Sequence, residues 1–135
     1  MISNCKTGDV RLVSEISPIE GRLEICINNA WGSVCRDSFS RDDAQVACRQ
    51  LGNVTDPQQT ATVIVDGTFN MSTGPIFLTD LECDGEESNL LSCGSPVYLH
   101  SCNHDKDVGV KCPGWWHNSY CFNICVLCCK HFLGR

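Results

Sequence analysis

The sequence predicts a small α+β domain, or one that is nearly all β, stabilised by disulfides. Three observations support this fold class. Several short segments show the alternation or β-branched content that is typical of strands, whereas only one segment has the periodicity of a good helix. In addition, 12 of the 135 residues are cysteine. A reducing cytosol would leave most of these cysteines as thiols, so the composition favours an oxidising compartment outside the cell.

The predicted strands begin near the N-terminus. Residues 10–13 (VRLV) form the first, and residues 17–21 (SPIEG) supply turn residues before the next. Residues 21–27 (GRLEICI) alternate, which predicts a half-buried strand. The apolar face of this strand consists of Leu23, Ile25 and Ile27. The opposite face consists of Arg22, Glu24 and Cys26.

A tight hairpin follows this strand. Asn28 and Asn29 tolerate the positive φ that a short turn requires, so residues 30–35 (AWGSVC) are the expected partner strand. Further strands are predicted over residues 61–65, 75–81 and 108–112.

The one helix is predicted in residues 40–52 (SRDDAQVACRQLG). Ser40 is a good N-cap with Asp43 three residues later, and Gly52 suits the position after the C-cap. The residues with helical apolar spacing are Ala44, Ala47, Cys48 and Leu51. Cys48 is therefore expected to face the core.

Four motifs, in this order and spacing, carry a resemblance to a known family. They are GRLEICINNAWGSVC, DDAQVACRQLG, GPIFLTDLECDGEESNLLSC and CNHDKDVGVKC. Together they make residues 9–112 similar to a scavenger receptor cysteine-rich (SRCR) domain. The resemblance implies a compact disulfide-bonded α+β domain in which a curved antiparallel sheet cradles one main helix. Residues 1–8 are then a leader or linker.

Six cysteines of this region match the family, and counting alone allows fifteen pairings. The chain lacks two cysteines of the larger subgroup, so it resembles the three-disulfide, group A-like subgroup. The resemblance implies the pairs Cys35 with Cys102, Cys48 with Cys112, and Cys83 with Cys93. Cys26 is not a family cysteine; it is either free or paired with Cys5.

Residues 113–135 differ in composition from the domain and form a cysteine-rich tail without acidic residues. We interpret the tail as disordered, as a truncated membrane-proximal segment, or as translated non-coding sequence. A tetrahedral zinc site or lipidation are the alternatives for its clustered residues, His117, Cys121, Cys125, Cys128, Cys129 and His131. The apolar run at residues 120–129 is about half as long as a bilayer core demands.

The sequence excludes several function classes. The net charge is −6 and the chain has no run of Lys and Arg, which argues against nucleic acid as a partner. No signature of a nucleophile elbow, a zinc protease or a phosphate-binding loop is present, so we expect no enzyme, no catalytic residue and no cofactor. His100 and His104 flank Cys102 and are interpreted as hydrogen-bonded structural residues.

Many domains of the resembled family bind calcium or magnesium through surface carboxylates. Where the family often has an Asp pair after V-C, this chain has Arg36 and Asp37, and Lys106 stands where a Glu is common. At the family's second site, Thr79 and Ser101 replace an Asp and an Asn. Hard cations need several oxygen ligands, so we expect no metal site and a surface ion pair at Asp37.

Two sequons, at Asn53 and Asn70, fall in predicted loops where a glycan could be accommodated. The first ten residues lack the features of a secretory signal, so we expect either that Met1 is internal to a longer protein or that the export signal is missing. The expected location is extracellular, either secreted or in the ectodomain of a membrane protein. Membrane contact is expected only through a missing part of the parent protein.

The resemblance favours an extracellular recognition module of a scavenger-receptor or host-defence protein, which binds protein or polyanionic ligands through its loops without catalysis. Two alternatives remain. The domain is a structural spacer in a modular ectodomain, or the chain is a small metal-binding or redox polypeptide that acts through its tail. Fold alone does not decide among them.

Overall fold

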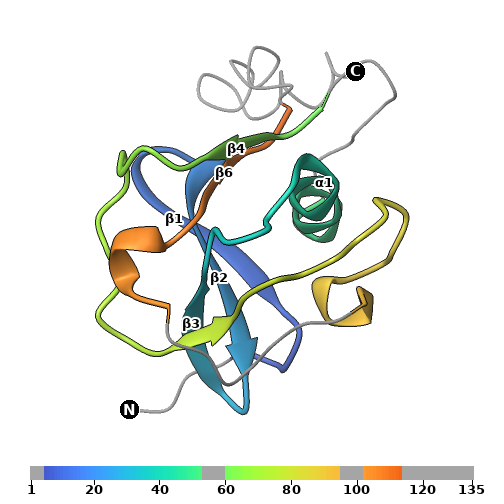
Figure 1. Ribbon diagram of the computed structural model, residues 1–135, viewed down its shortest axis with the longest axis horizontal. Coiled ribbons are helices and arrows are strands. Elements are labelled where there is room, and N and C mark those ends of the chain that lie inside the picture. Colours follow the sequence, from blue (N-terminus) through green and yellow to red (C-terminus); the bar gives the residue numbers. More distant parts are fainter. Residues whose placement is uncertain (1–4, 53–59, 95–101, 114–135) are drawn as a thin grey trace, which may run out of the picture.

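The computed structural model describes residues 5–52, 60–94 and 102–113. These residues contain a six-stranded sheet, one α-helix and two short 3₁₀ helices, η1 and η2 (Figure 1). The elements are β1 (Val10–Ser17), β2 (Glu20–Ile27), β3 (Ala30–Val34), α1 (Arg41–Gln50), β4 (Thr62–Ile64), β5 (Ile76–Leu78), η1 (Leu90–Ser92), η2 (His104–Lys106) and β6 (Gly109–Lys111). The predicted α+β fold class is confirmed, and each predicted strand and the helix are present.

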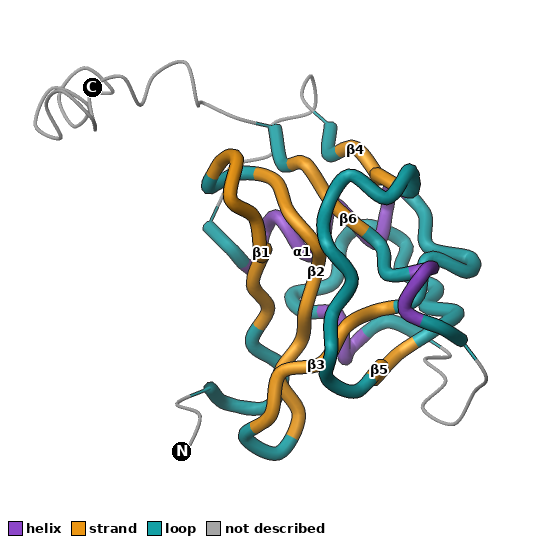
Figure 2. The backbone as a smooth tube through the Cα atoms, turned by 90° about the vertical axis from the view of Figure 1, so that its left-hand side faces the viewer, coloured by secondary structure: helices purple, strands orange, loops and turns teal. Residues whose placement is uncertain are grey.

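The long strand β2 organises the sheet. It pairs antiparallel with β1 along one edge, and with β3 and β6 near its two ends on the other (Figure 2). β4 extends the sheet beyond β6, also antiparallel. The sheet is antiparallel, as expected, except for the pairing of β3 with β5, which is parallel. The reason is the long connection between these strands, which contains α1 and β4 and returns the chain in the same direction.

The local signals for turn and helix behave as predicted. Asn28 and Asn29 have φ of 52° and 69°, as the tight turn between β2 and β3 requires. Ser40 and Asp43 form a complete capping box at the start of α1, and Gly52 follows the C-cap residue with φ of 85°. These local hydrogen bonds define where the helix begins and ends.

The core lies between α1 and the sheet. The helix contributes four buried hydrophobic side chains, which pack in one cluster with strand and loop residues; the cluster includes Ala44, Val46, Ala47, Cys48, Leu23, Ile25, Val34, Leu78, Val108 and Val110. Cys48 is fully buried, as its helical position predicts.

β2 is more deeply buried than the alternation predicts. Glu24 and Cys26, on the face expected to meet solvent, have relative exposures of 3% and 0%. The prediction that the strand in residues 21–27 is buried on one face only is therefore wrong, because Glu24 and Cys26 on the other face are also buried. Cys5 covers Cys26 through a disulfide, and two arginine side chains cover Glu24.

Four disulfides connect the described residues. Three are the pairs that the resemblance implies, Cys35–Cys102, Cys48–Cys112 and Cys83–Cys93. The fourth joins Cys5 to Cys26, which resolves the alternative left open for Cys26 and leaves the three-disulfide subgroup unconfirmed. This bridge attaches the expected leader segment to the end of β2.

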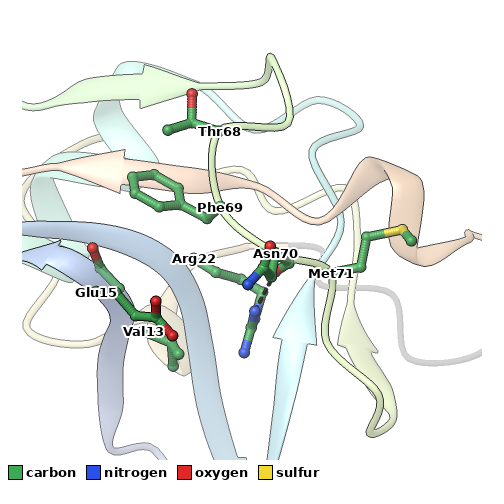
Figure 3. Close-up of a pocket in the computed structure, with 8 residues that line it drawn as sticks. Val13, Glu15, Arg22, Thr68, Phe69, Asn70 and Met71 are labelled. Atoms are coloured by element: carbon green, nitrogen blue, oxygen red, sulfur yellow. Dashed lines mark hydrogen bonds between the residues drawn. The ribbon is translucent and has the colours of Figure 1, made fainter.

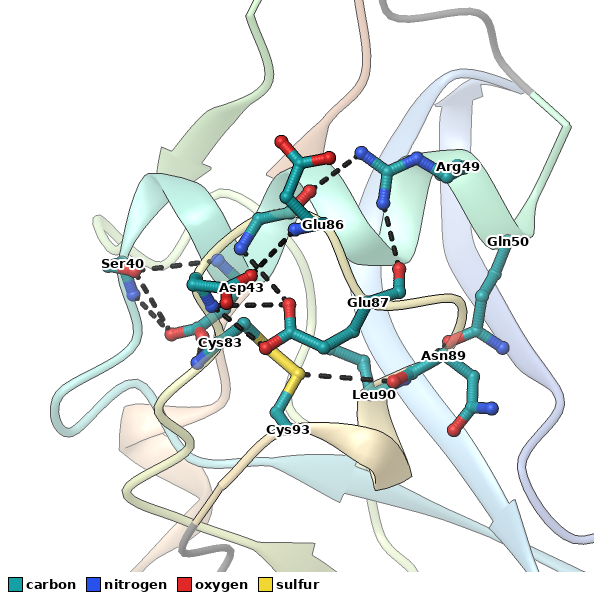
Figure 4. Close-up of a disulfide and its surroundings, with 12 residues drawn as sticks. Ser40, Asp43, Arg49, Gln50, Cys83, Glu86, Glu87, Asn89, Leu90 and Cys93 are labelled. Atoms are coloured by element: carbon teal, nitrogen blue, oxygen red, sulfur yellow. Dashed lines mark hydrogen bonds between the residues drawn. A yellow bond between two sulfur atoms is a disulfide. The ribbon is translucent and has the colours of Figure 1, made fainter.

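The Cys83–Cys93 loop is also attached to α1 by hydrogen bonds (Figure 4). Asp43 Oδ2 accepts the Ser40 N–H at 2.7 Å, while Oδ1 accepts the Cys83 N–H at 2.8 Å. Arg49 donates to the carbonyls of Gly85 and Glu87 at 2.7 and 2.8 Å. The helix thus positions the loop through side chains that include a buried carboxylate, a guanidinium and the Gln50 amide.

Residues 114–135 lie outside the described residues, so the expectations for the cysteine-rich tail remain predictions. Within the described ranges, no helix has the length and apolar character needed to cross a membrane.

Candidate functional site

The candidate site is the surface where the β4–β5 loop, residues 65–75, crosses β2. Two shallow grooves lie there and share Arg22 and Met71. The first, which we call the Phe69 groove, has a volume of about 410 Å³ and is lined by Val13, Ser14, Glu15, Arg22, Thr68, Phe69, Asn70 and Met71 (Figure 3). The second, the Trp31 groove, is about 310 Å³ and is lined by Arg11, Arg22, Glu24, Trp31, Met71, Ser72, Thr73 and Gly74.

A buried carboxylate organises the floor of the Trp31 groove. Glu24 Oε1 accepts hydrogen bonds from Arg11 Nε at 3.0 Å and Nη2 at 2.7 Å. Glu24 Oε2 accepts from Arg22 Nε and lies 3.0 Å from Arg22 Nη2. The Glu24 side chain is 4% exposed, so its charge is paired and enclosed. A buried carboxylate is tolerated when it is paired in this way.

The exposed chemistry of the groove is cationic, aromatic and apolar. The Arg11 side chain is 46% exposed, and its Cζ lies 4.3 Å from the centroid of the Trp31 ring. Met71 is 60% exposed. Arg, Trp and Met are among the residues enriched in protein interfaces, and Arg and Trp are frequent hot spots. The arrangement can therefore offer a charged donor and apolar area to a ligand.

The loop is joined to the sheet by a hydrogen bond from β2 and by close packing on β6. Arg22 Nη1 donates to the carbonyl of Asn70, as the dashed line in Figure 3 shows. The Phe69 ring packs so closely on Gly109 of β6 that a Cβ there would lie 2.7 Å from Phe69 Cδ2. The residues between these anchors and β5 present Met71 and Thr73 to solvent.

The family's first cation position holds no carboxylate cluster in this chain. Lys106 Nζ lies 3.7 Å from Asp37 Oδ2, which is the surface ion pair that we expected. Arg36 donates instead to the carbonyl of Val65 at 3.0 Å. At the second position Thr79 is buried, and Ser101 lies outside the described residues.

Two groups of described residues have several metal-ligating atoms close together, and both include the two cysteines of a disulfide: Cys35, Asp37 and Cys102, and Cys83, Glu87 and Cys93. Oxidised sulfurs cannot act as thiolate ligands. In the second group, the Glu87 carboxylate already accepts hydrogen bonds from the backbone N–H groups of Asp84 and Gly85 in its own loop. These hydrogen bonds lower the pKa of Glu87.

The remaining predicted site residues are the two sequon asparagines and the two histidines that flank Cys102. Asn70 is exposed on the β4–β5 loop, while Asn53 and His100 lie outside the described residues. His104 is hydrogen-bonded through both ring nitrogens, as a structural histidine should be.

Sequence reasoning missed both grooves and the Arg11–Glu24–Arg22 network. The network was visible only as a same-face relation between Arg22 and Glu24 on a predicted strand. The β1–β2 register, which places Arg11 opposite Glu24, supplies the third member. No local motif indicates that residues 70–74 return across β2.

Comparisons with known proteins identify the family of the chain. Residues 13–113 match the family described as the scavenger receptor cysteine-rich domain. The chain is 42% identical over 109 residues to the egg peptide speract receptor of Strongylocentrotus purpuratus, covering 78% of this chain and 20% of that protein. It is 41% identical over 108 residues to the galectin-3-binding protein of Rattus norvegicus, covering 79% and 18%. The chain thus spans a fifth or less of these relatives.

Solved structures show the same fold. The third SRCR domain of murine neurotrypsin superimposes with a TM-score of 0.66 at 34% identity, covering 76% of this chain and 94% of that chain. The SRCR domain of mouse MARCO, in its dimeric form, gives a TM-score of 0.59 at 34% identity, covering 69% and 85%. Together with four disulfides around one helix and a curled sheet, these matches show that the chain belongs to the scavenger receptor cysteine-rich domain family.

Proposed function

We propose that this chain is an extracellular ligand-recognition module that binds a protein or polyanionic ligand without catalysis, and that the ligand contacts the Trp31 groove, including residues 71–74 of the β4–β5 loop. The observation that carries the proposal is the combination of exposed Arg11 and Met71 with half-buried Trp31 on a disulfide-bonded sheet. Several relatives are named as receptors or binding proteins, which supports recognition as the general role.

Charge supports a ligand with acidic groups at this position. The chain has a net charge of −6, yet the accessible charge in the Trp31 groove is the Arg11 guanidinium, because Glu24 is enclosed. The ligand contact is direct rather than bridged by a cation, since Asp37 is paired with Lys106. The module acts outside the cell, where its disulfides persist.

Binding of the immobilised domain to dextran sulfate, to neutral dextran and to a panel of recombinant extracellular proteins tests the proposal. We expect at least one anionic member of this set to bind equally in calcium and in chelator. Met71→Ser and Arg11→Gln should weaken that binding, whereas the matched surface changes Val65→Ser and Arg41→Gln should not. Equal effects of all four variants, or binding that needs calcium, would contradict the proposed surface and contact. Thermal melting of each variant identifies any that has lost its fold.

The structural-spacer alternative gives the opposite result, because a spacer binds none of these probes. A count of free thiols and bound zinc in the oxidised chain tests the other alternative, a metal-binding or redox polypeptide. The recognition reading requires the eight cysteines of the four disulfides to be oxidised.

A further inference from the structure

One histidine links the end of the β4–β5 loop to the segment before β6. His104, at the start of η2, places Nε2 2.7 Å from the carbonyl oxygen of Gly74. Its other ring nitrogen, Nδ1, lies 2.9 and 3.0 Å from the two carboxylate oxygens of Asp107. The ring therefore connects the loop to the segment that leads into β6.

Both partners of the ring are hydrogen-bond acceptors. A carbonyl oxygen can only accept, and an ionised carboxylate likewise has no proton to donate. A neutral imidazole has one N–H and one bare nitrogen, so it can satisfy only one of the two contacts. The bare nitrogen would face an oxygen lone pair at a hydrogen-bonding distance. Only the doubly protonated imidazolium can donate a hydrogen bond to both partners.

Asp107 is suited to stabilise that charge. Its side chain is 5% exposed, compared with 25% for the His104 side chain. Asp107 Oδ2 also accepts the N–H of Ser72 at 2.8 Å, and the Ser72 hydroxyl accepts the N–H of Gly74 at 3.0 Å. The histidine and the carboxylate thus hold the same short segment, residues 72–74, at two points.

The other polar groups around the ring are few. Arg22 on β2 contributes a repelling positive charge, and the Ser33 hydroxyl on β3 lies 3.4 Å from Nδ1. Burial lowers the pKa of His104, but the hydrogen bonds to Asp107 and Gly74 and the Asp107 charge together raise it above its ordinary value.

We propose that protonated His104 latches residues 72–74, so that the wall of the Trp31 groove is firm in acid and loosens when His104 loses a proton. Its importance for ligand binding rests on the proposed function, because these residues line the groove. A folded-state pKa above the unfolded value of about 6.5 means that the latch stabilises the fold fully below that pH. The stabilisation is lost as the pH rises through the folded-state pKa.

Nitrogen NMR of the full chain tests the latch directly. We expect both ring nitrogens of His104 to carry protons in acid, with a midpoint above that of a histidine in the unfolded chain. His104→Gln identifies the signal among the four histidines. Asp107→Asn should move the midpoint below the unfolded value, because burial and Arg22 then dominate. A neutral ring with one tautomer throughout the acid range would overturn the proposal.

Amide hydrogen exchange measures how strongly His104 holds residues 72–74 in place. After correction for the intrinsic pH dependence, exchange at Ser72 and Gly74 should accelerate roughly tenfold or more as His104 deprotonates, as expected for loss of a charge-assisted hydrogen bond. In His104→Gln the exchange should be fast and independent of this titration. The Thr68 N–H, which donates to Asp66 in the same loop, is the internal control and should not respond. Unchanged exchange at residues 72 and 74 would also overturn the latch.

The two proposals fail in different ways. If no probe binds the domain, the ring titration and the loop exchange are still measurable, and only the proposed function is lost. If a probe binds but neither measurement changes with His104, the recognition surface remains and the latch is rejected.

Discussion

At the scale of single residues, buried charges are placed where they connect segments that are distant in sequence. Asp43 caps its own helix and accepts the N–H of Cys83, and Glu24 joins β1 to β2 through Arg11 and Arg22. Each carboxylate is enclosed, so loss of its partners would leave an unpaired buried group.

Replacing Asp43 tests this role. Asp43→Ala should lower the free energy of unfolding by about 1–3 kcal/mol, because the N–H groups of Ser40 and Cys83 lose their acceptor. Asp42→Ala, on the exposed side of the same helical turn, should have a much smaller effect. Urea unfolding measures both. Equal effects would mean that Asp43 acts only through the helix dipole.

The buried carboxyl group of Asp43 should make the stability of the domain depend on pH. Burial raises the pKa of Asp43, although hydrogen bonds from Ser40 and Cys83 act against this rise. A carboxyl with a raised folded-state pKa contributes most stability below its unfolded pKa of about 3.9 and loses it as the pH rises. The stability of the unmodified chain relative to Asp43→Asn should therefore fall with rising pH across that range. A rise measured over the same range would show that the hydrogen bonds dominate.

Asn70 is the described sequon residue and lies exposed beside Met71. We predict that it carries a glycan when the chain is exported, because its side chain is accessible and its backbone carbonyl, rather than its amide, is bonded to Arg22. Mass spectrometry of protein secreted from animal cells, with and without a glycosidase, checks this. Asn70→Gln and Ser72→Ala should each remove the same mass, and persistence of that mass in either variant would contradict the assignment.

At the scale of elements, β2 determines how the rest of the sheet is arranged. Its length allows it to pair with three strands. On its second face, Cys5 covers Cys26, and the side chains of Arg11 and Arg22 cover Glu24. The disulfide from Cys5 and the hydrogen bond from the Gly8 N–H to the Cys26 carbonyl, at 2.8 Å, attach the N-terminal segment to the same strand.

The Cys5–Cys26 bridge should stabilise the domain without being needed for its fold. It spans 21 positions, for which the chain-entropy account gives about 3 kcal/mol. Cys5→Ala combined with Cys26→Ala should therefore remain folded, with a lower free energy of urea unfolding and circular dichroism like that of the unmodified chain. An unfolded double variant would show that this bridge is essential, and unchanged stability would show that it is inert.

At the scale of the whole molecule, the two long bridges enclose most of the chain. Cys35–Cys102 and Cys48–Cys112 span 67 and 64 positions, and each is worth roughly 4 kcal/mol in the same account. This is comparable with the whole stability of a small domain, about 5–15 kcal/mol. The last of these cysteines is followed at once by the residues of changed composition.

We therefore predict that a chain ending at Pro113 folds alone. It retains all four bridges and the whole described core, so its thermal midpoint should match that of the full chain, and a thiol assay should detect no free cysteine. A reductant should unfold both chains. An insoluble or thiol-rich truncated chain would mean that residues 114–135 belong to the core.

The sequence by itself determined the features that depend on neighbours along the chain. Strand alternation, the Asn28–Asn29 turn and the Ser40–Asp43 capping box are local, because each is satisfied by residues a few positions apart. The four motifs added the family. Only the tertiary structure decided the parallel β3–β5 pairing, the enclosure of Glu24, the partner of Cys26 and the two contacts of His104. Each of these joins residues that a loop or the sheet register brings together, and neither loop path nor register is encoded in a local pattern.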